Sequence, residues 1–291
     1  MTQQTIIISG CGDIGQRVAR RWLANGAKVM GLSRSQANAK ILQNAGIEPL
    51  HADLDHAETL RTLPLQGAIL YHFAPPPASG DTDPRTRALL GAIQSDTLPS
   101  IVIMISTTAV YGDCAGAWVT EDTPVNPQTA RGKRRLDAEL ALTQWSATYQ
   151  VPAVILRVPG IYGPGRLPLE RIQSGEPILR EADAPYTNRI HADDLAMICV
   201  RAAEHGQSGL YNVSDNQPGN MSQYFKAIAD AFALPRPPEI TREEAEKVLS
   251  AGMLSYLKES RRIDNSKLIN EWGIRLQYPD LAAGLAAMKR I

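Results

Sequence analysis

The chain has few of the features that mark several large classes of protein. It contains three cysteines in 291 residues, far apart and without a CxxC pair, which argues against a disulfide framework or a zinc site. Lysine plus arginine (30) equals aspartate plus glutamate (30), so no net field favours nucleic acid or an anionic membrane. No apolar run approaches the roughly 20 residues of a membrane-spanning helix. The expected partners are small molecules and other copies of the chain, as a homodimer.

The first residues, MTQQTIIISG, have no basic segment and no apolar run long enough for a secretory signal. The sparse cysteines fit a reducing compartment. We therefore expect a cytoplasmic protein. Its length suffices for one large globular body with a substantial core.

Short apolar segments alternate with segments of helical period through the first half of the chain. The apolar segments are 5–9, 27–32, 46–53, 66–74, 101–106 and 151–158. Strands that are apolar throughout and separated by helices predict a parallel sheet covered on both faces. The expected fold class is α/β, a doubly wound parallel sheet of the Rossmann type.

The composition changes after residue 160 to segments rich in glycine, proline and charge. We expect residues 1–160, joined by 187–212, to form the Rossmann domain. Residues 161–186 and 213–291 would form a small, interleaved α+β lobe that binds substrate. Such a lobe would cover the carboxyl ends of the strands, where open α/β sheets bind ligands.

The segment SGCGDIG follows the first predicted strand and opens a helix. Gly10, Gly12 and Gly15 stand in GxGxxG spacing. In this context one glycine turns the chain, one lets the backbone approach a pyrophosphate, and one packs helix on strand. The segment predicts a dinucleotide site, and a plain strand-to-helix turn is the alternative.

The end of the second predicted strand bears on the choice of dinucleotide. NAD sites usually have Asp or Glu there for the ribose 2′-hydroxyl, but this chain has Ser33 and Arg34. A hydroxyl beside a guanidinium suits a 2′-phosphate, so the pair favours NADP over NAD. The alternative is that Arg34 only extends along the surface. Asp53, after the third strand, is a candidate for the adenine edge or for a helix N-cap.

Several stretches together resemble the extended short-chain dehydrogenase/reductase superfamily, the NAD(P)-dependent epimerase/dehydratase family. They are SGCGDIG, HADL, ISTTAVYGD, EDTPVNP, LRVPGIYGPGR, NRIHADDLA and LYNVSDNQP. The chain looks like an atypical member, similar to the YeeZ-like subgroup. The glycine turn and this resemblance together give the expected cofactor-binding residues: Gly10, Gly12, Asp13, Ile14, Gly15, Ser33, Arg34, Asp53, Leu54, Phe73, Ala74, Pro75, Ser106 and Pro159.

The stretch TARGKRRLDAE, residues 129–139, departs from that family. The resemblance implies a Tyr general acid or base here, with a Lys four residues later that lowers the pKa of the Tyr. One alignment places Arg131 and Arg135 at the two positions, and another places Thr129 and Lys133 there. Arginine, with a pKa above about 12, cannot exchange protons usefully at neutral pH. Any activity must use a different acid.

The same stretch predicts the start of a long helix, with Leu136, Leu140 and Leu142 turned inward. Its first turn is rich in cations, which oppose the helix dipole. One hypothesis is that Arg131 or Lys133 meets a bound anion, from the cofactor or from a substrate. The alternative is that these cations are solvated or contact a second subunit.

The resemblance places Thr107 where the family keeps the hydroxyl that holds the substrate oxygen. A residue that merely completes a strand is the alternative. Tyr162, Tyr186, His191 and Lys133 are the available replacement acids, and Tyr186, in the loop APYTNR, ranks first among them. The candidate active-site residues are therefore Thr107, Arg131, Arg135 and Tyr186.

Two functions remain open from the sequence. The first is an NADP-dependent oxidoreductase or epimerase-like enzyme acting on a small polar or anionic substrate. The second is a non-catalytic NADP(H)-binding sensor or regulatory protein. Hydride transfer, or its absence, separates the two.

Overall fold

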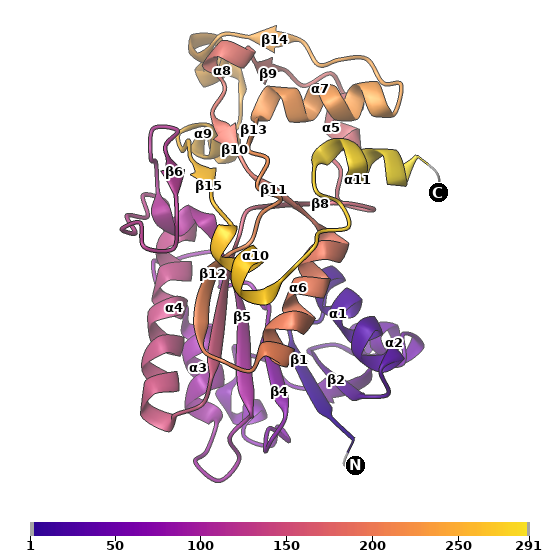
Figure 1. Ribbon diagram of the computed structural model, residues 1–291, viewed down its shortest axis with the longest axis vertical. Coiled ribbons are helices and arrows are strands. Elements are labelled where there is room, and N and C mark those ends of the chain that lie inside the picture. Colours follow the sequence, from indigo (N-terminus) through magenta and orange to yellow (C-terminus); the bar gives the residue numbers. More distant parts are fainter. Residues whose placement is uncertain (1–2, 290–291) are drawn as a thin grey trace. The chain divides into compact units, whose positions relative to one another are not determined.

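A computed structural model describes residues 3–289 of the chain (Figure 1). Clustering of contacts divides the chain into two compact units. The first consists of Met1–Val110, Ala130–Arg157 and Leu195–Tyr211. The second consists of Tyr111–Thr129, Val158–Asp194 and Asn212–Ile291.

A seven-stranded sheet forms the centre of the first unit, with strand order β12-β7-β5-β4-β1-β2-β3. The pairs β1–β2, β1–β4, β2–β3 and β4–β5 are all parallel. The predicted fold class, a doubly wound parallel α/β sheet, is thereby confirmed. The strands are β1 (Thr5–Ser9), β2 (Lys28–Ser33), β3 (Glu48–His51), β4 (Ile69–His72), β5 (Ile101–Thr107), β7 (Ala153–Val158) and β12 (Gly209–Asn212).

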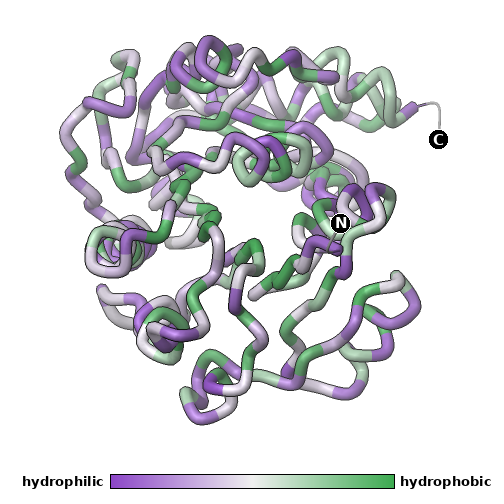
Figure 2. The backbone as a smooth tube through the Cα atoms, turned by 60° about the horizontal axis from the view of Figure 1, so that its bottom comes forward, coloured by the Kyte–Doolittle hydropathy of each residue, from purple (hydrophilic) through white to green (hydrophobic). Residues whose placement is uncertain are grey.

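The central strands are buried on both faces, which explains why they read as apolar throughout, whereas the edge strand β3 is exposed at both ends. Figure 2 colours much of their length as hydrophobic, whereas the surrounding helices alternate between hydrophobic and hydrophilic residues. Such helices bury one stripe against the sheet and expose the other to water. The helices of this unit are α1 (Asp13–Ala24), α2 (Gln36–Asn44), α3 (Pro84–Ala92), α4 (Ala130–Tyr149) and α6 (Ala192–His205).

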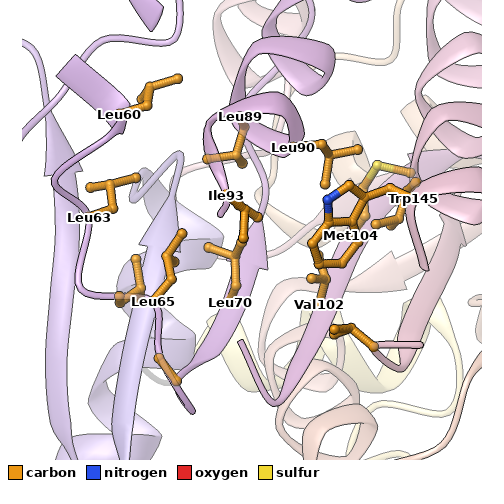
Figure 3. Close-up of a cluster of buried hydrophobic side chains, with 14 of the residues drawn as sticks. Leu60, Leu63, Leu65, Leu70, Leu89, Leu90, Ile93, Val102, Met104 and Trp145 are labelled. Carbon is orange, nitrogen blue, oxygen red and sulfur yellow. The ribbon is translucent and has the colours of Figure 1, made fainter. Parts of the chain in front are cut away.

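Helices α3 and α4 cover one face of the sheet. Leu89 of α3 and Trp145 of α4 belong to the same buried cluster as Leu70 and Val102 of the strands (Figure 3). Successive strand residues point to opposite faces, so Tyr71 points to the other side. There its hydroxyl accepts a hydrogen bond from Trp22 of α1 (2.9 Å) and donates one to a backbone carbonyl of α6 (3.1 Å). Helices α1 and α6 therefore cover the second face.

The predicted inward face of α4 is wrong at one position. Leu142 is buried, but Leu140 is 61% exposed. Residues two apart on a helix lie about 200° apart around its axis, so these two leucines cannot share a face. The buried face consists instead of Ala138, Leu142 and Trp145, at spacings of four and three.

A buried ion pair joins α4 to β7. Glu139 and Arg157 are each under 10% exposed, and Arg157 Nη2 lies 2.7 Å from Glu139 Oε2. Ser106 Oγ donates a 2.5 Å hydrogen bond to Glu139 Oε1. Such a pair is costly to bury but costlier to break, so these residues fix the register of α4 on the sheet.

The second unit is built from short strand pairs and helices. Three pairs are parallel and one, β10–β13, is antiparallel. The strands pair as β6 (Trp118–Val119) with β15 (Arg262–Ile263), β8 (Gly160–Tyr162) with β11 (Arg189–His191), β9 (Ile178–Leu179) with β14 (Glu239–Ile240), and β10 (Tyr186–Thr187) with β13 (Gly219–Asn220). The helices are α5 (Leu169–Gln173), α7 (Met221–Ala231), α8 (Arg242–Val248), α9 (Ala251–Leu257), α10 (Ser266–Trp272) and α11 (Leu281–Met288).

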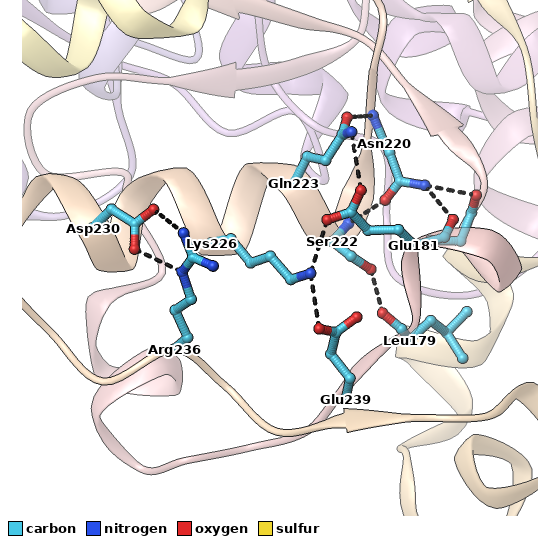
Figure 4. A network of polar contacts seen from close by, with 10 residues as sticks. Leu179, Glu181, Asn220, Ser222, Gln223, Lys226, Asp230, Arg236 and Glu239 are labelled. Atoms are coloured by element: carbon cyan, nitrogen blue, oxygen red, sulfur yellow. Dashed lines mark hydrogen bonds and ion pairs between the residues drawn. The ribbon is translucent and has the colours of Figure 1, made fainter.

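Helix α7 is anchored by a polar network (Figure 4). Asn220 and Gln223 form a capping box at its N-terminus. Lys226 Nζ lies 2.8 Å from a carboxylate oxygen of Glu181 and 2.8 Å from one of Glu239. These two ion pairs tie the exposed side of α7 to two neighbouring segments. Its apolar side packs against α5 and α11.

The unit boundaries differ from the predicted domains in two segments, 111–129 and 187–194, which cluster with the second unit. Asn212 accounts for the grouping of 111–129. It accepts a hydrogen bond from Tyr111 (2.8 Å) and donates from its backbone to Glu121 (2.7 Å) and from its side chain to the carbonyl of Asp264 (3.1 Å). These long-range contacts leave no mark in the local sequence pattern.

Of the helices formed by residues 3–289, none has the length and apolar character needed to cross a membrane.

Candidate functional site

The three glycines of the first turn have three different environments. Gly10 has φ +86°, and a Cβ there would lie 2.3 Å from the backbone nitrogen of Ala74. A Cβ at Gly15 would lie 3.1 Å from Gly10 O, where α1 packs on β1. A Cβ at Gly12 would meet no atom of residues 3–289 within 4 Å. The packing of the chain explains Gly10 and Gly15, whereas the open space at Gly12 leaves room for a bound group.

Gly12 is also the N-cap of α1, and no side chain in the described part of the chain caps this helix. The first backbone N–H groups of a helix lack partners within the helix, and its N-terminus carries a partial positive charge. Open space at an uncapped helix N-terminus is the geometry that binds a pyrophosphate. Ile14 is buried, and Asp13 is paired with Arg17 (2.8 Å) one turn along α1. The residues of the turn therefore fit a dinucleotide.

The two residues predicted to select the dinucleotide differ in what they contact. Ser33 is buried; its hydroxyl donates to the carbonyl of Ser35 (2.9 Å) and accepts from Asn38 Nδ2 (3.2 Å). It therefore shapes the start of α2. The side chain of Arg34 is 64% exposed, and its Nη1 lies 3.8 Å from Asp55 Oδ2.

The candidate Asp53 closes a local turn. Its Oδ1 accepts a hydrogen bond from the backbone N–H of Asp55 (3.1 Å), and this bond is the main cause that lowers the pKa of Asp53. Arg85 donates two hydrogen bonds to the carboxylate of Asp55, from Nε to Oδ1 (2.7 Å) and from Nη2 to Oδ2 (2.6 Å). These bonds lower the pKa of Asp55. Leu54 lies half-buried between the two acidic residues.

The loop after β4 lies against the glycine turn. The backbone N–H groups of Phe73 and Ala74 both donate to the carbonyl of Ser9, at 2.8 and 3.1 Å. Arg135 Nη1 donates to the carbonyl of Ala74 (3.3 Å), and Arg85 donates to that of Pro75 (3.2 Å). The three candidate residues of this loop are thus held by their backbones.

The cations at the start of α4 bind this same loop. Lys133 Nζ lies 3.2 Å from Asp81 Oδ2, and the buried Arg134 donates to the carbonyl of Gly80 (2.6 Å). Arg135 is half-buried, and desolvation lowers its pKa. The loop carbonyls and Asp81 therefore offset the unfavourable interaction of these cations with the positive N-terminal end of the α4 dipole. Arg131 is half-buried in the first turn of the helix.

At the end of β5, two neighbouring hydroxyls have different roles. Ser106 donates into the buried Glu139–Arg157 pair, so its hydroxyl is used within the fold. Thr107 is half-buried, and its Oγ1 accepts a hydrogen bond from the backbone N–H of Ala109 (3.2 Å). A hydroxyl that accepts can still donate its own proton.

The remaining candidates belong to the second unit. Tyr186 is 44% exposed, and the guanidinium carbon of Arg262 lies 4.9 Å from the centre of its ring. Pro159 is half-buried after β7. Tyr162 is fully buried, and its hydroxyl donates to the carbonyl of Asp280 (3.0 Å). Burial raises the pKa of Tyr162, which argues against it as a proton donor at neutral pH.

Comparison with known proteins decides the family. Residues 6–214 match the profile of the NAD dependent epimerase/dehydratase family. The chain belongs to the NAD dependent epimerase/dehydratase family. The predicted membership is thus confirmed.

Individual proteins resemble the chain over nearly its whole length. The chain is 27% identical to Protein YeeZ of Escherichia coli K12, over 94% of this chain and 96% of that protein. A functionally unknown conserved protein from Silicibacter pomeroyi is 30% identical, with a TM-score of 0.83 and 99% coverage of both chains. A dTDP-glucose 4,6-dehydratase from Bacillus anthracis, in complex with NAD, shares the fold with a TM-score of 0.79 at 18% identity, covering 99% of this chain and 96% of that one.

In this family member a buried histidine supports the glycine turn, and sequence reasoning missed it. Thr86 donates to Asp83 Oδ2 (2.8 Å), so His72 Nε2 donates to Thr86 Oγ1 (2.8 Å) and Nδ1 accepts from Ser9 Oγ (3.3 Å). Burial, and then the nearby Arg135, lower the pKa of His72 to about 3, so it stays neutral. The chain of bonds ends at Ser9, next to the glycine turn. The available signal was a histidine inside an otherwise apolar strand.

Asp215 of the second unit was also missed. It is 5% exposed, and its Oδ1 accepts a hydrogen bond from the backbone N–H of Gln217 (3.0 Å). Burial raises the pKa of Asp215 to about 7, although Arg189 acts in the opposite direction. A buried carboxyl that titrates near neutral pH is unusual and often marks a functional position.

Replacing Gly12 by Ala should separate cofactor binding from folding. The free energy of unfolding should stay within about 1 kcal/mol of the parent, because the new methyl group meets no described atom. Affinity for NADPH and NADH should fall at least about tenfold, because the methyl group enters the space left for the pyrophosphate. Urea unfolding and isothermal titration measure the two quantities. Gly10→Ala is the contrasting variant and should destabilise the fold; a Gly12→Ala protein that binds like the parent would exclude this site.

Asp215→Asn should change how stability depends on pH. An unfolded Asp has a pKa of about 3.9, so between about pH 4 and 7 the unfolded chain releases this proton while the native chain keeps it. The parent therefore loses stability over that range, and the neutral Asn variant does not. The unfolding free energy of Asp215→Asn minus that of the parent should therefore rise by about 2–4 kcal/mol from pH 4 to pH 8. Asp230→Asn is the control: Arg236 lowers the pKa of Asp230, so this carboxyl is ionised in both states over most of this range and its difference should stay nearly constant. A difference that stays constant for Asp215→Asn as well would contradict the assignment.

Proposed function

We propose that the chain is an NADP-preferring oxidoreductase or epimerase-like enzyme for a small polar or anionic substrate, without the Tyr-x-x-x-Lys pair. The observation that carries the proposal is the open space at Gly12 above the uncapped N-terminus of α1. A protein that no longer bound a dinucleotide would have no need to keep this space empty. When bound, the nicotinamide supplies or accepts a hydride.

The preference for NADP is supported by the charges around Asp55. Arg85 already neutralises this carboxylate through two short bonds, whereas Arg34 contacts it only at 3.8 Å. The exposed guanidinium of Arg34 can therefore turn to a 2′-phosphate at little cost. No carboxylate stands at positions 33–34 to repel that phosphate.

The roles of the remaining residues follow from the bonds that they already make. Thr107 has a proton to donate to a substrate oxygen, since the hydrogen bond from the backbone N–H of Ala109 uses only a lone pair of its hydroxyl. Arg135 holds the loop at Ala74, so it positions the cofactor loop and exchanges no proton. The proton transfer is assigned to Tyr186, whose side chain is exposed and carries a titratable phenol.

Arg34→Ala tests the cofactor preference. In isothermal titration the parent should bind NADPH at least about tenfold more tightly than NADH, and the variant should lose this preference while keeping its affinity for NADH. Arg201→Ala is the matched control, because Arg201 is an exposed arginine of the same unit, paired with Glu204. If the parent binds NADH as well as NADPH, or if Arg34→Ala keeps the preference, the NADP assignment fails.

Hydride transfer tests the enzymatic part. NADPH deuterated at C4 of the nicotinamide should transfer deuterium to the carbonyl carbon of at least one compound in a panel of 2-oxo acids and keto sugars, followed by mass spectrometry. Tyr186→Phe should lower the rate at least about a hundredfold, and Tyr149→Phe, in α4, should not. Cofactor binding without any transfer would support the sensor function instead, and parent-like rates in Tyr186→Phe would reject Tyr186 as the acid.

A further inference from the structure

Arg262, in β15 of the second unit, lies against two aromatic rings. Its guanidinium carbon is 5.4 Å from the centre of the Trp118 ring and 4.9 Å from the centre of the Tyr186 ring. Both distances are in the range of cation–π attraction. Trp118 is 48% exposed and Tyr186 is 44% exposed, although tryptophan is highly buried on average. The three side chains therefore form a cationic and aromatic cluster that is open to ligands.

A turn with unusual backbone angles fixes the guanidinium in this cluster. Arg262 Nε donates to the carbonyl of Gly116 (2.7 Å), and the pairing of β6 with β15 places Arg262 opposite Trp118. Gly116 has φ +76°, and a Cβ there would lie 3.2 Å from the ring of Tyr186. Ala115 has φ +49°, which is uncommon for a residue with a side chain. Such strain persists where the surrounding contacts enforce it, and it is concentrated at functional sites.

The outer end of the Arg262 guanidinium has no partner within the described part of the chain. Among residues 3–289 its side chain makes one hydrogen bond, from Nε, and no ion pair. Neither Nη1 nor Nη2 is among the buried polar atoms that lack a partner, so both are accessible from outside. The neighbouring Arg261, in contrast, is buried and pairs with Glu259 at 3.0 Å. The two Nη groups of Arg262 therefore present a planar set of donors that matches a carboxylate in two parallel bonds.

The charge at the cluster favours a carboxylate over a phosphate. Arg262 supplies one positive charge, and that of Arg261 is already engaged by Glu259. A phosphate monoester carries about 1.5 to 2 negative charges at pH 7, so Arg262 alone would leave it partly unneutralised. The exposed rings of Trp118 and Tyr186 add apolar surface beside the guanidinium, which suits an apolar group joined to the carboxylate.

We infer that Arg262 binds the carboxylate of the substrate, and that the substrate is an oxo acid or hydroxy acid with an apolar side group. The inference rests on the proposed function, because Tyr186, the proposed acid, is one of the two rings against which Arg262 lies. A carbonyl or hydroxyl close to the bound carboxylate would therefore be near the phenol of Tyr186. Trp118 is the surface on which the apolar side group lies.

Binding of 3-phenyllactate to the full chain tests this inference. Isothermal titration without cofactor should give a Kd below about 1 mM. Three comparison compounds each lack one expected feature: 3-phenyllactamide lacks the charge, lactate lacks the ring, and phenyl phosphate replaces the carboxylate by a phosphate. Each should bind at least about tenfold more weakly than 3-phenyllactate.

Two variants and a matched control locate the binding. Arg262→Met should weaken 3-phenyllactate binding at least about tenfold, and Trp118→Leu at least about threefold. Trp118 is half exposed, so its variant should fold even if Arg262→Met does not. Arg236→Met alters an exposed arginine of the same unit, paired with Asp230, and should bind like the parent. The inference is overturned if 3-phenyllactate does not bind, if the amide or the phosphate binds as tightly, or if either Arg262→Met or Trp118→Leu binds like the parent.

Failure of this inference and failure of the proposed function give different results, because the titration needs neither cofactor nor turnover. Binding of 3-phenyllactate through Arg262 without any deuterium transfer from NADPH would keep the carboxylate site and reject the enzyme. Deuterium transfer to neutral keto sugars without 3-phenyllactate binding would keep the enzyme and overturn the carboxylate site.

Discussion

The close approach of Gly10 to Ala74 is the constraint on which the candidate cofactor site depends. The two backbones lie so close that any Cβ at Gly10 would overlap the nitrogen of Ala74. Ala74 is held in turn by its own bond to Ser9 and by Arg135 on its carbonyl. This contact fixes the ends of β1 and β4 against each other. The path of the chain through Gly12 into α1 follows from it.

The same contact gives the unusual start of α4 a physical role. Three consecutive cations, Lys133, Arg134 and Arg135, all bind the loop that carries Ala74. Their charges are therefore used in holding the loop and not in proton exchange, for which arginine is unsuited. This use of the stretch agrees with the proposal that proton transfer relies on another group.

The sheet, the glycine turn and the family could be predicted because local patterns encode them. Buried strands appear in the sequence as short apolar runs at regular intervals, and the turn requires glycine where two backbone segments approach each other closely. Contacts between distant segments could not be predicted in this way. They include the support of the turn by His72 and the grouping of 111–129 with the second unit. The choice of NADP and the roles of Thr107 and Tyr186 stay predictions.

We propose that the open space at Gly12 receives a dinucleotide, and a crystal structure of the chain grown with NADPH tests this most directly. Electron density should appear for the pyrophosphate over the first turn of α1, in contact with Gly12, and for the 2′-phosphate beside Arg34. Density for the dinucleotide elsewhere on the chain, or an unoccupied turn at saturating NADPH, would contradict it.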